Sequence, residues 1–436
     1  MVDSTSQSTA KPKSSTRRKV FGVFAVISVT LLSVSIVLEI GLRIFWRLIP
    51  LGVCASSPII GNYYCQPYIV YDKPINLAYH YAPGFKTQGW WDPADPHDAN
   101  PGNETAPTGR SDKFFYTLQM DSMGFPNDDV TWKDQYDIVI AGDSFVLRSA
   151  PQTWIELLRG ETQMSTLTLG APSWAPMNYS AAIEKYGLDK HPKWVIMMYF
   201  EGNDLYGTGQ YLERQPTGLS WAEWDFQHSS LGDQLIMPHL VSYAAQQLFP
   251  PSETPQYRYP ITASTEAGYV QLVLKDFQLL ALSADYNTLA HSDEFLAIKA
   301  RILQVKQEVE AQGAHFLLVY IPSKEHVYWS RIWDPKDVNN ILERTETVTL
   351  SDGDHGHLVY SPQYLSFDVF NQNQTAQELL FDDMTKENKV EFLNLMPVFW
   401  NEAIKHGELY NYADPHWNQA GNQLAADTIA EYIKTH

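Results

Sequence analysis

Residues 136–145 read YDIVIAGDSF, and the prediction of the fold class starts from this stretch. Tyr136–Ala141 is a short apolar run that leads directly into turn residues, which is typical of a buried strand. Gly142 permits a tight turn where that strand ends. Ser144 is then expected at or near the N-terminus of a helix, where backbone N–H groups favour developing negative charge.

After Asp134, short apolar runs alternate with longer amphipathic stretches, which indicates β-α units and a parallel sheet. Right-handed crossovers make this a doubly wound sheet with helices on both faces. The expected strands are Tyr136–Ala141, Ser165–Leu169, Trp194–Phe200, His315–Ile321 and Val390–Leu393. The expected helices are Thr153–Gly160, Tyr179–Tyr186, Glu294–Gln312, Thr375–Thr385 and Trp417–Lys434.

The composition divides the chain into four predicted segments. Residues 1–19 form a Ser/Thr/Lys-rich disordered tail, residues 20–48 a transmembrane signal anchor, and residues 49–133 an irregular neck rich in Pro, Gly, Asn and Asp. Residues 134–436 form the α/β domain. Within it, residues from about 205 to 292 interrupt the alternation and are expected to form an insertion over the carboxyl edge of the sheet.

The anchor is predicted from Val20–Leu38, a run of nineteen residues without a charge. About 20 apolar residues cross the hydrocarbon core of a bilayer. A cleaved signal peptide is the alternative, but the run leads into Glu39, Arg43 and Arg47 among large apolar residues instead of a cleavage site. Five basic residues precede the run, so the N-terminus is expected in the cytoplasm and the α/β domain outside it, in the periplasm or the extracellular space.

The formal net charge of −19 argues against nucleic acid as a partner, because phosphate binding needs a basic face. Hydrophobic residues make up 44% of the chain, enough for a sizeable core. Both cysteines, Cys54 and Cys65, follow the predicted span. A disulfide between them suits an oxidising compartment, and two unpaired thiols are the alternative.

Polar residues follow the ends of the first three predicted strands and precede the last helix. They are Ser144 in AGDSF, Gly170 in LGAPSW, Asn203 in EGND, and Asp414 with His416 in DPHWN. The carboxyl ends of parallel strands lie at one edge of a sheet, so we expect these residues to converge there. Each motif alone is weak, since turns and helix caps produce Gly-Asp-Ser and Asn-Asp often.

As an ordered set, AGDSF, LGAPSW, EGND and DPHWN resemble the four blocks of the SGNH/GDSL hydrolases over Asp134 to the C-terminus. The stretches LEIGLRIF, YAPGF, DSMGFPND and IPSKEHVY are similar to the membrane-anchored bacterial branch of that family. The resemblance implies an α/β/α three-layer, flavodoxin-like sheet and a serine hydrolase acting on ester bonds.

The expected roles follow from acyl-transfer chemistry and from the resemblance. Ser144 is the nucleophile, His416 its general base, and Asp414, on an exposed loop, orients the imidazole. The backbone N–H groups of Ser144 and Gly170 and the side-chain amide of Asn203 form the oxyanion hole. Asp143 is expected to brace the turn and not to act as the base.

The two-residue spacing from Asp414 to His416 departs from the usual three and resembles the branch that contains polysaccharide O-acetyltransferases. Three functions therefore stay open at this point. The first is an esterase that removes acyl groups, most simply acetyl, from an extracytoplasmic glycan or a small ester. The second is an O-acetyltransferase that uses the same serine, within a polysaccharide-modification complex. The third is an inactive glycan-binding module.

No cofactor and no metal are expected, because the histidines lack metal-ligand spacing. The polar stretch SDGDHGH, residues 351–357, is interpreted as a solvated loop. Four tryptophans are weighed as sugar-stacking residues against the more common core role: Trp90, Trp91, Trp221 and Trp224.

Overall fold

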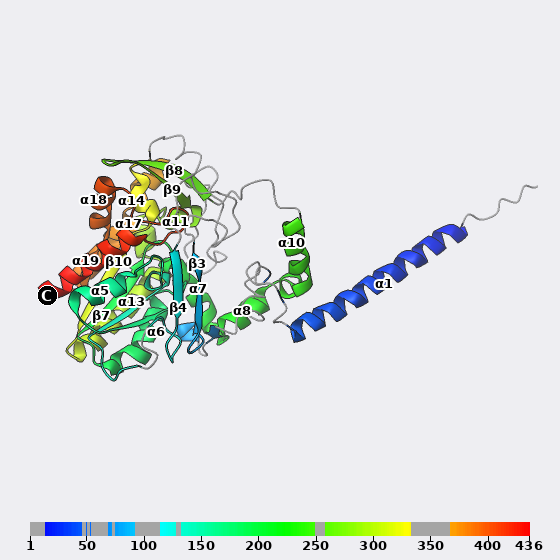
Figure 1. Cartoon of the computed structure of the whole chain (residues 1–436), viewed down its shortest axis with the longest axis horizontal. Coiled ribbons are helices and arrows are strands. Elements are labelled where there is room, and N and C mark those ends of the chain that lie inside the picture. Colours follow the sequence, from blue (N-terminus) through cyan, green and yellow to red (C-terminus); the bar gives the residue numbers. More distant parts are fainter. Residues whose placement is uncertain are drawn as a thin grey trace, which may run out of the picture. The chain divides into compact units, whose positions relative to one another are not determined.

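The computed structural model describes residues 14–45, 49, 53, 69–71, 75–91, 114–127, 132–248, 258–332 and 367–436. The chain divides into two compact units (Figure 1). Met1–Pro67 and Asp225–Pro251 make up the first unit, and Tyr68–Trp224 and Ser252–His436 make up the second. Part of the predicted insertion therefore belongs to the unit that contains the predicted anchor.

The second unit is built on a five-stranded sheet in the order β11-β10-β7-β5-β6, in which every neighbouring pair is parallel. All residues of β5, β6 and β7 are buried, as expected for strands covered on both faces. The strand order reverses at β5, which makes its carboxyl end the topological switch point. The strands are β5 (Ile138–Gly142), β6 (Thr166–Gly170), β7 (Trp194–Phe200), β10 (His315–Ile321) and β11 (Glu391–Asn394).

Helices connect these strands and cover both faces of the sheet. α5 packs against α19, and α13 packs against α6 (Figure 1). The predicted three-layer α/β/α fold class is confirmed by this arrangement. The connecting helices are α5 (Trp154–Thr162), α6 (Pro176–Ala182), α13 (Asp293–Ala311), α17 (Ala376–Asn388) and α19 (Gln419–Thr435).

Local sequence explains where these helices begin. The side chain of Ser292 accepts a hydrogen bond from the backbone N–H of Phe295 and caps α13, whose buried residues recur at helical spacing. Asn418 caps α19 in the same way, through the N–H of Gly421. Thr153 and Glu156 form a reciprocal capping box at the start of α5.

The segment predicted as an insertion is mostly helical, with one antiparallel hairpin. It contains α7 (Asp204–Arg214), α8 (Trp221–His228), α9 (Leu231–Gln234), α10 (Ile236–Leu248), β8 (Arg258–Thr265), β9 (Gly268–Lys275), α11 (Asp276–Ala281) and α12 (Tyr286–Ala290). Further along the chain lie α14 (Lys324–Trp329), α16 (Phe367–Asn373) and α18 (Met396–His406).

The segment predicted as an irregular neck contributes two small antiparallel sheets to the second unit. Their strands are β1 (Ile69–Tyr71), β2 (Tyr79–Tyr81), β3 (Lys86–Trp91) and β4 (Phe114–Gln119).

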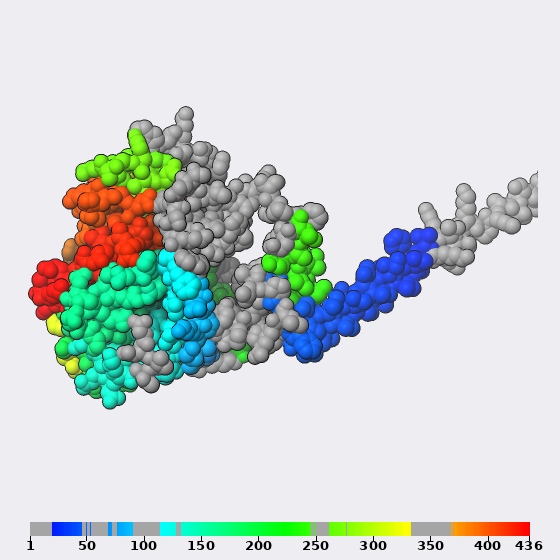
Figure 2. Space-filling view, in the orientation of Figure 1, coloured from blue at the N-terminus to red at the C-terminus, as the bar shows by residue number. Residues whose placement is uncertain are grey.

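Figure 2 shows the last part of the chain, in orange and red, between the yellow-green of β8 and β9 and the blue-green residues that surround α5. Segments far apart in the sequence thus share one surface.

The first unit is dominated by α1 (Ser14–Ile44). Its stretch Val20–Ile44 is long and apolar enough to cross a membrane, and none of its most apolar window is buried. A signal sequence near the N-terminus can pass the same test of length and composition, so the membrane anchor and its orientation stay predictions.

Candidate active site

Ser144 lies in a sharp turn directly after β5. Asp143 caps this turn, because its Oδ1 accepts the backbone N–H of Phe145 at 2.9 Å. A Cβ on Gly142 would lie 2.8 Å from Val146 Cγ1 and 3.0 Å from Met198 Cβ, so only glycine fits there. Ser144 is the first residue of a short 3-10 helix, Ser144–Val146, so it lies at a helix N-terminus as expected. α5 begins ten residues later, and a single turn contributes little helix dipole.

The structure brings Ser144, His416 and Asp414 into one hydrogen-bonded chain. The Ser144 hydroxyl lies 2.6 Å from His416 Nε2. His416 Nδ1 lies 2.6 Å from Asp414 Oδ1, and the same oxygen accepts the backbone N–H of His416 at 2.9 Å. The proton on Nδ1 faces a carboxylate, which leaves Nε2 as the acceptor for the serine hydroxyl. This is the geometry that a nucleophile, a base and an orienting acid require.

Asp414 is buried, with 8% of its surface exposed, so the exposed loop expected from the sequence is wrong. The physical cause is Lys324, a fully buried side chain at the start of α14. Its Nζ donates to the carbonyl oxygens of Asn411, Tyr412 and Asp414 at 3.1, 3.0 and 3.0 Å. The ammonium group therefore holds the loop that carries Asp414 against the core.

The ionisation of Asp414 fits this position. Burial alone would raise the pKa of its carboxyl group, but the electrostatic interaction with the neighbouring His416 ring and the two hydrogen bonds that Asp414 accepts from His416 outweigh burial. The net effect holds the pKa of Asp414 well below its usual range. Asp414 thus stays a carboxylate and stabilises positive charge on the imidazole.

The three groups predicted for the oxyanion hole also converge on the Ser144 turn. Gly142 and Gly170 are register partners at the ends of β5 and β6, and a Cβ on Gly170 would overlap the carbonyl oxygen of Gly142. Asn203 Nδ2 donates to Asp143 Oδ2 at 3.4 Å, and the Ser144 hydroxyl reaches the same oxygen at 3.4 Å. The amide of Asn203 carries a second N–H, so it can face a substrate while keeping this contact.

Asp143 is placed as a brace, in agreement with its expected role. Its two oxygens accept from the Phe145 N–H, the Ser144 hydroxyl and the Asn203 amide. Burial raises the pKa of Asp143, and the hydrogen bonds it accepts oppose that rise. The nearer basic atom to the Ser144 hydroxyl is His416 Nε2, at 2.6 Å against 3.4 Å.

Glu201 and His326 are buried at the EGND motif, and neither of them has a role in the sequence prediction. Glu201, the first residue of EGND, accepts the Tyr320 hydroxyl at 2.5 Å and the Ser323 N–H at 2.6 Å. Its carboxylate also faces His326 Nδ1 at 3.0 Å. Burial lowers the pKa of His326, but the charge of Glu201 outweighs burial and raises it. The Glu201–His326 pair therefore connects the end of β7 to α14, the helix that begins at Lys324.

Lys324 and His326 both belong to IPSKEHVY, a stretch quoted above only for its family resemblance. A signal was present in the sequence, because charged residues that directly follow a fully apolar strand must be exposed or paired. Which groups they pair with depends on loops about 90 and 125 residues away, which periodicity does not reveal.

The aromatic candidates differ in their placement. Trp221 is buried, and the Arg214 guanidinium stacks 4.1 Å above its ring. The same guanidinium lies 4.6 Å from the centre of the Trp224 ring. Trp90 and Trp91 lie in β3, where only the backbone is described. Trp221 is therefore a core residue.

Other predicted features fall on chain that the structure does not describe. Cys54, Cys65 and the polar stretch 351–357 lie outside the described residues. Within the described ranges, no group of three or more His, Cys, Asp or Glu side chains is arranged to hold a metal ion.

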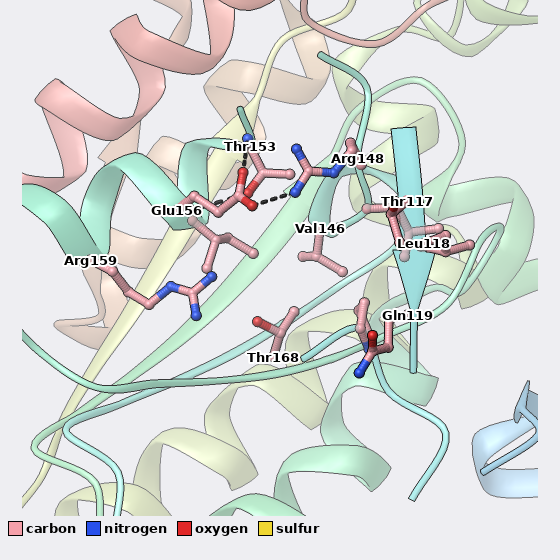
Figure 3. Close-up of a pocket in the computed structure, with 12 residues that line it drawn as sticks. Thr117, Leu118, Gln119, Val146, Arg148, Thr153, Glu156, Arg159 and Thr168 are labelled. Carbon is pink, nitrogen blue, oxygen red and sulfur yellow. Dashed lines mark hydrogen bonds and ion pairs between the residues drawn. The ribbon is translucent and has the colours of Figure 1, made fainter. Parts of the chain in front are cut away.

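A cavity of about 160 Å³ lies beside the Ser144 turn (Figure 3). The Arg148 guanidinium pairs with the Glu156 carboxylate at its rim, and Arg159 and Thr168 also line it. Val146 and Leu147 form part of its wall, whereas Ser144 and His416 do not. The cavity is thus separate from the Ser144–His416 pair.

No family model matches the sequence, and no curated protein matches it. Solved structures similar to the chain include the acetyl xylan esterase AlAXEase, with 12% identity and a TM-score of 0.31 over 68% of this chain and 99% of that chain. A protein of Slackia heliotrinireducens described as an SGNH hydrolase has 10% identity and a TM-score of 0.31, over 68% and 97% of the two chains. A catalytic mutant of Axe2, an acetylxylan esterase from Geobacillus stearothermophilus, has 8% identity and a TM-score of 0.31, over 68% and 93%. The case for function therefore rests on the geometry of the site.

Proposed function

We propose that the chain is a membrane-anchored serine esterase that removes acyl groups, most simply acetyl, from an extracytoplasmic glycan. The single observation that carries the proposal is the hydrogen-bonded chain Ser144–His416–Asp414, with 2.6 Å at each side-chain contact. A serine within hydrogen-bond distance of a histidine that is oriented by a buried carboxylate is the arrangement typical of an activated nucleophile.

In the first step, Ser144 Oγ forms a bond to the acyl carbonyl carbon while His416 Nε2 takes the hydroxyl proton. Negative charge develops on the carbonyl oxygen and is stabilised by the N–H groups of Ser144 and Gly170 and by the Asn203 amide. The C–O bond to the alcohol then breaks, and His416 returns the proton to the leaving oxygen. Water attacks the acyl-enzyme by the same route, which releases the acid and restores the serine.

Each oxyanion donor is a substantial part of this proposal, since losing one typically costs about 3–4 kcal/mol of transition-state stabilisation. Their attachment to three successive strands, β5, β6 and β7, supports the assignment because the sheet fixes their spacing. Two of the three are backbone groups, so only Asn203 can be removed by simple substitution.

A fluorophosphonate probe tests the nucleophile in the full chain. Labelling and p-nitrophenyl acetate turnover should both disappear in Ser144→Ala. Both should persist in Ser242→Ala, which alters an exposed serine of α10. Undiminished turnover in Ser144→Ala would refute the mechanism. Acetate release from an O-acetylated polysaccharide, compared with acetyl transfer onto an added sugar acceptor, then decides whether water or a hydroxyl resolves the acyl-enzyme.

The membrane location is tested separately. Reporter fusions after residue 60 should be active outside the cytoplasm and should sediment with the membrane fraction. A soluble, N-terminally trimmed product would show that Val20–Ile44 is a signal sequence.

A further inference from the structure

Glu39 is the first charged residue after the uncharged run of α1, yet only 8% of it is exposed. Its carboxylate accepts the backbone N–H groups of Ile236 at 3.0 Å and of Met237 at 2.9 Å. These are the first residues of α10, whose N–H groups have no partner within the helix. Glu39 therefore caps a helix that lies almost 200 residues further along the chain.

A second contact fixes the same junction. Arg43 Nε pairs with Glu39 Oε1 at 2.8 Å, and its guanidinium donates to the carbonyl oxygen of Gln234 at 2.7 Å. A small apolar cluster of Ile49, Val53 and Ile236 packs beside it. α10 is thus attached to the end of α1 that carries Glu39 (Figure 1).

The surface of α10 is unusual for a soluble helix. Its thirteen residues include no Asp, Glu, Lys or Arg, although 19% of the chain is charged. Val241 and Leu248 are 61% and 73% exposed, and Leu231 in the adjoining α9 is 72% exposed. Val241 and Leu248 are seven residues apart, which places them on the same face of the helix, and an exposed apolar face indicates a binding partner.

What covers this surface follows from the helix to which it is attached. The candidate span in α1 is itself apolar and unburied, and lipid is the solvent that suits such a helix. The first residues of α10 contact Glu39, which is the first charged residue beyond the uncharged run of α1. The hydrocarbon core of a bilayer would end at this residue. A helix with exposed apolar side chains gains binding energy when it buries them at the boundary between the headgroups and the acyl chains, because binding strength scales with the apolar area buried there.

We infer that α10 is a second membrane-contacting element, which lies in the interfacial region of the lipid bilayer beside the outer end of α1. The inference rests on the proposed anchoring by α1 and is independent of the chemistry at Ser144. Since α10 carries no charged side chain, its lipid contact requires no anionic headgroup.

Photocrosslinking in proteoliposomes tests the inference on the full chain. p-Benzoylphenylalanine replaces Val241 in α10, Phe24 in α1, or the exposed Tyr269 near the start of β9. The vesicles are pure phosphatidylcholine or a mixture with phosphatidylglycerol. Circular dichroism and thermal unfolding report that each variant is folded.

We expect a lipid adduct by mass spectrometry at positions 241 and 24 and none at 269, with similar yields in both vesicle types. Lipid adducts at 24 but none at 241 would overturn the inference while leaving the anchor intact. Adducts from 241 to a second copy of the chain would overturn it as well, in favour of a protein interface. No lipid adduct at either 24 or 241 would overturn the anchor and the inference together, without bearing on the esterase.

Discussion

Replacing Asp414 with Asn tests whether the site works as a triad or as a Ser-His dyad. The substitution keeps the size of the side chain. It also keeps an oxygen that can accept from the backbone N–H and the ring Nδ1 of His416, which both bond to Asp414 Oδ1. What it removes is the negative charge opposite the imidazole. The change therefore isolates the electrostatic part of the contact from its shape.

The magnitude follows from burial. Asp414 is 8% exposed and lies 2.6 Å from His416, so solvent screens the pair poorly. Breaking a buried ion pair by removing one partner costs about 3–5 kcal/mol. Because His416 becomes positive only as Ser144 reacts, that cost appears in the transition state, and kcat should fall about 10²- to 10⁴-fold. In serine proteases the same carboxyl-to-amide change lowers kcat about 10⁴-fold.

The assay is the steady-state turnover of p-nitrophenyl acetate, with thermal unfolding measured in parallel. Asp285→Asn is the matched control, since it makes the same change at an exposed helix cap remote in sequence from the site. That control should leave kcat unchanged and lower Tm slightly. If Asp414→Asn changes kcat by less than about 10-fold and mainly lowers Tm, Asp414 is structural and the site is a dyad.

Three further outcomes are expected. Gly170→Ala should abolish turnover, because a Cβ there overlaps the end of β5, whereas Gly160→Ala meets no atom within 4 Å and should keep turnover and gain up to about 1 kcal/mol of helix stability. Lys324→Met should lower the free energy of unfolding in urea by about 3–5 kcal/mol, since three buried carbonyl groups lose their donor. The matched control Lys386→Met alters an exposed lysine and should leave the urea midpoint nearly unchanged, so similar small changes in both variants would contradict the role of Lys324 in holding the Asp414 loop. Asp137→Asn should cost about 1 kcal/mol at pH 7, because a lysine hydrogen bond lowers the pKa of Asp137 to about 2. That stability is present above the unfolded pKa of about 4 and is lost as the pH falls toward 2. If the difference in free energy of unfolding between the original chain and Asp137→Asn stays constant down to about pH 2.5, the stabilising role of the Asp137 carboxylate is contradicted.

The sheet could be predicted from the sequence because its strands are buried on both faces. Runs such as Trp194–Phe200 and His315–Ile321 contain almost only apolar residues, and the structure reproduces both bounds. The helix Asp293–Ala311 was equally accessible, since its apolar face and its Ser292 cap are local signals. Patterns that each element carries by itself are visible in a single sequence.

Features that depend on distant partners were not accessible in this way. The loop around Asp414 is polar in sequence and is buried only because Lys324 donates to it from ninety residues upstream. The hairpins in the predicted neck pair strands through cross-strand contacts, which composition rich in Pro and Gly conceals. The contact of Glu39 with α10 joins two segments that composition assigns to different parts of the chain.

The hydrogen bond between Ser144 and His416 also sets when the protein can first react. The two residues are 272 positions apart. At a synthesis rate of about 5–20 residues per second, the histidine leaves the ribosome on the order of 15–50 s after the serine. During that interval the serine is an ordinary alcohol with no base to take its proton. Under the proposed mechanism, a chain that is still being synthesised therefore carries its nucleophile in an unreactive state, and reactivity begins only when the loop of His416 closes onto the sheet.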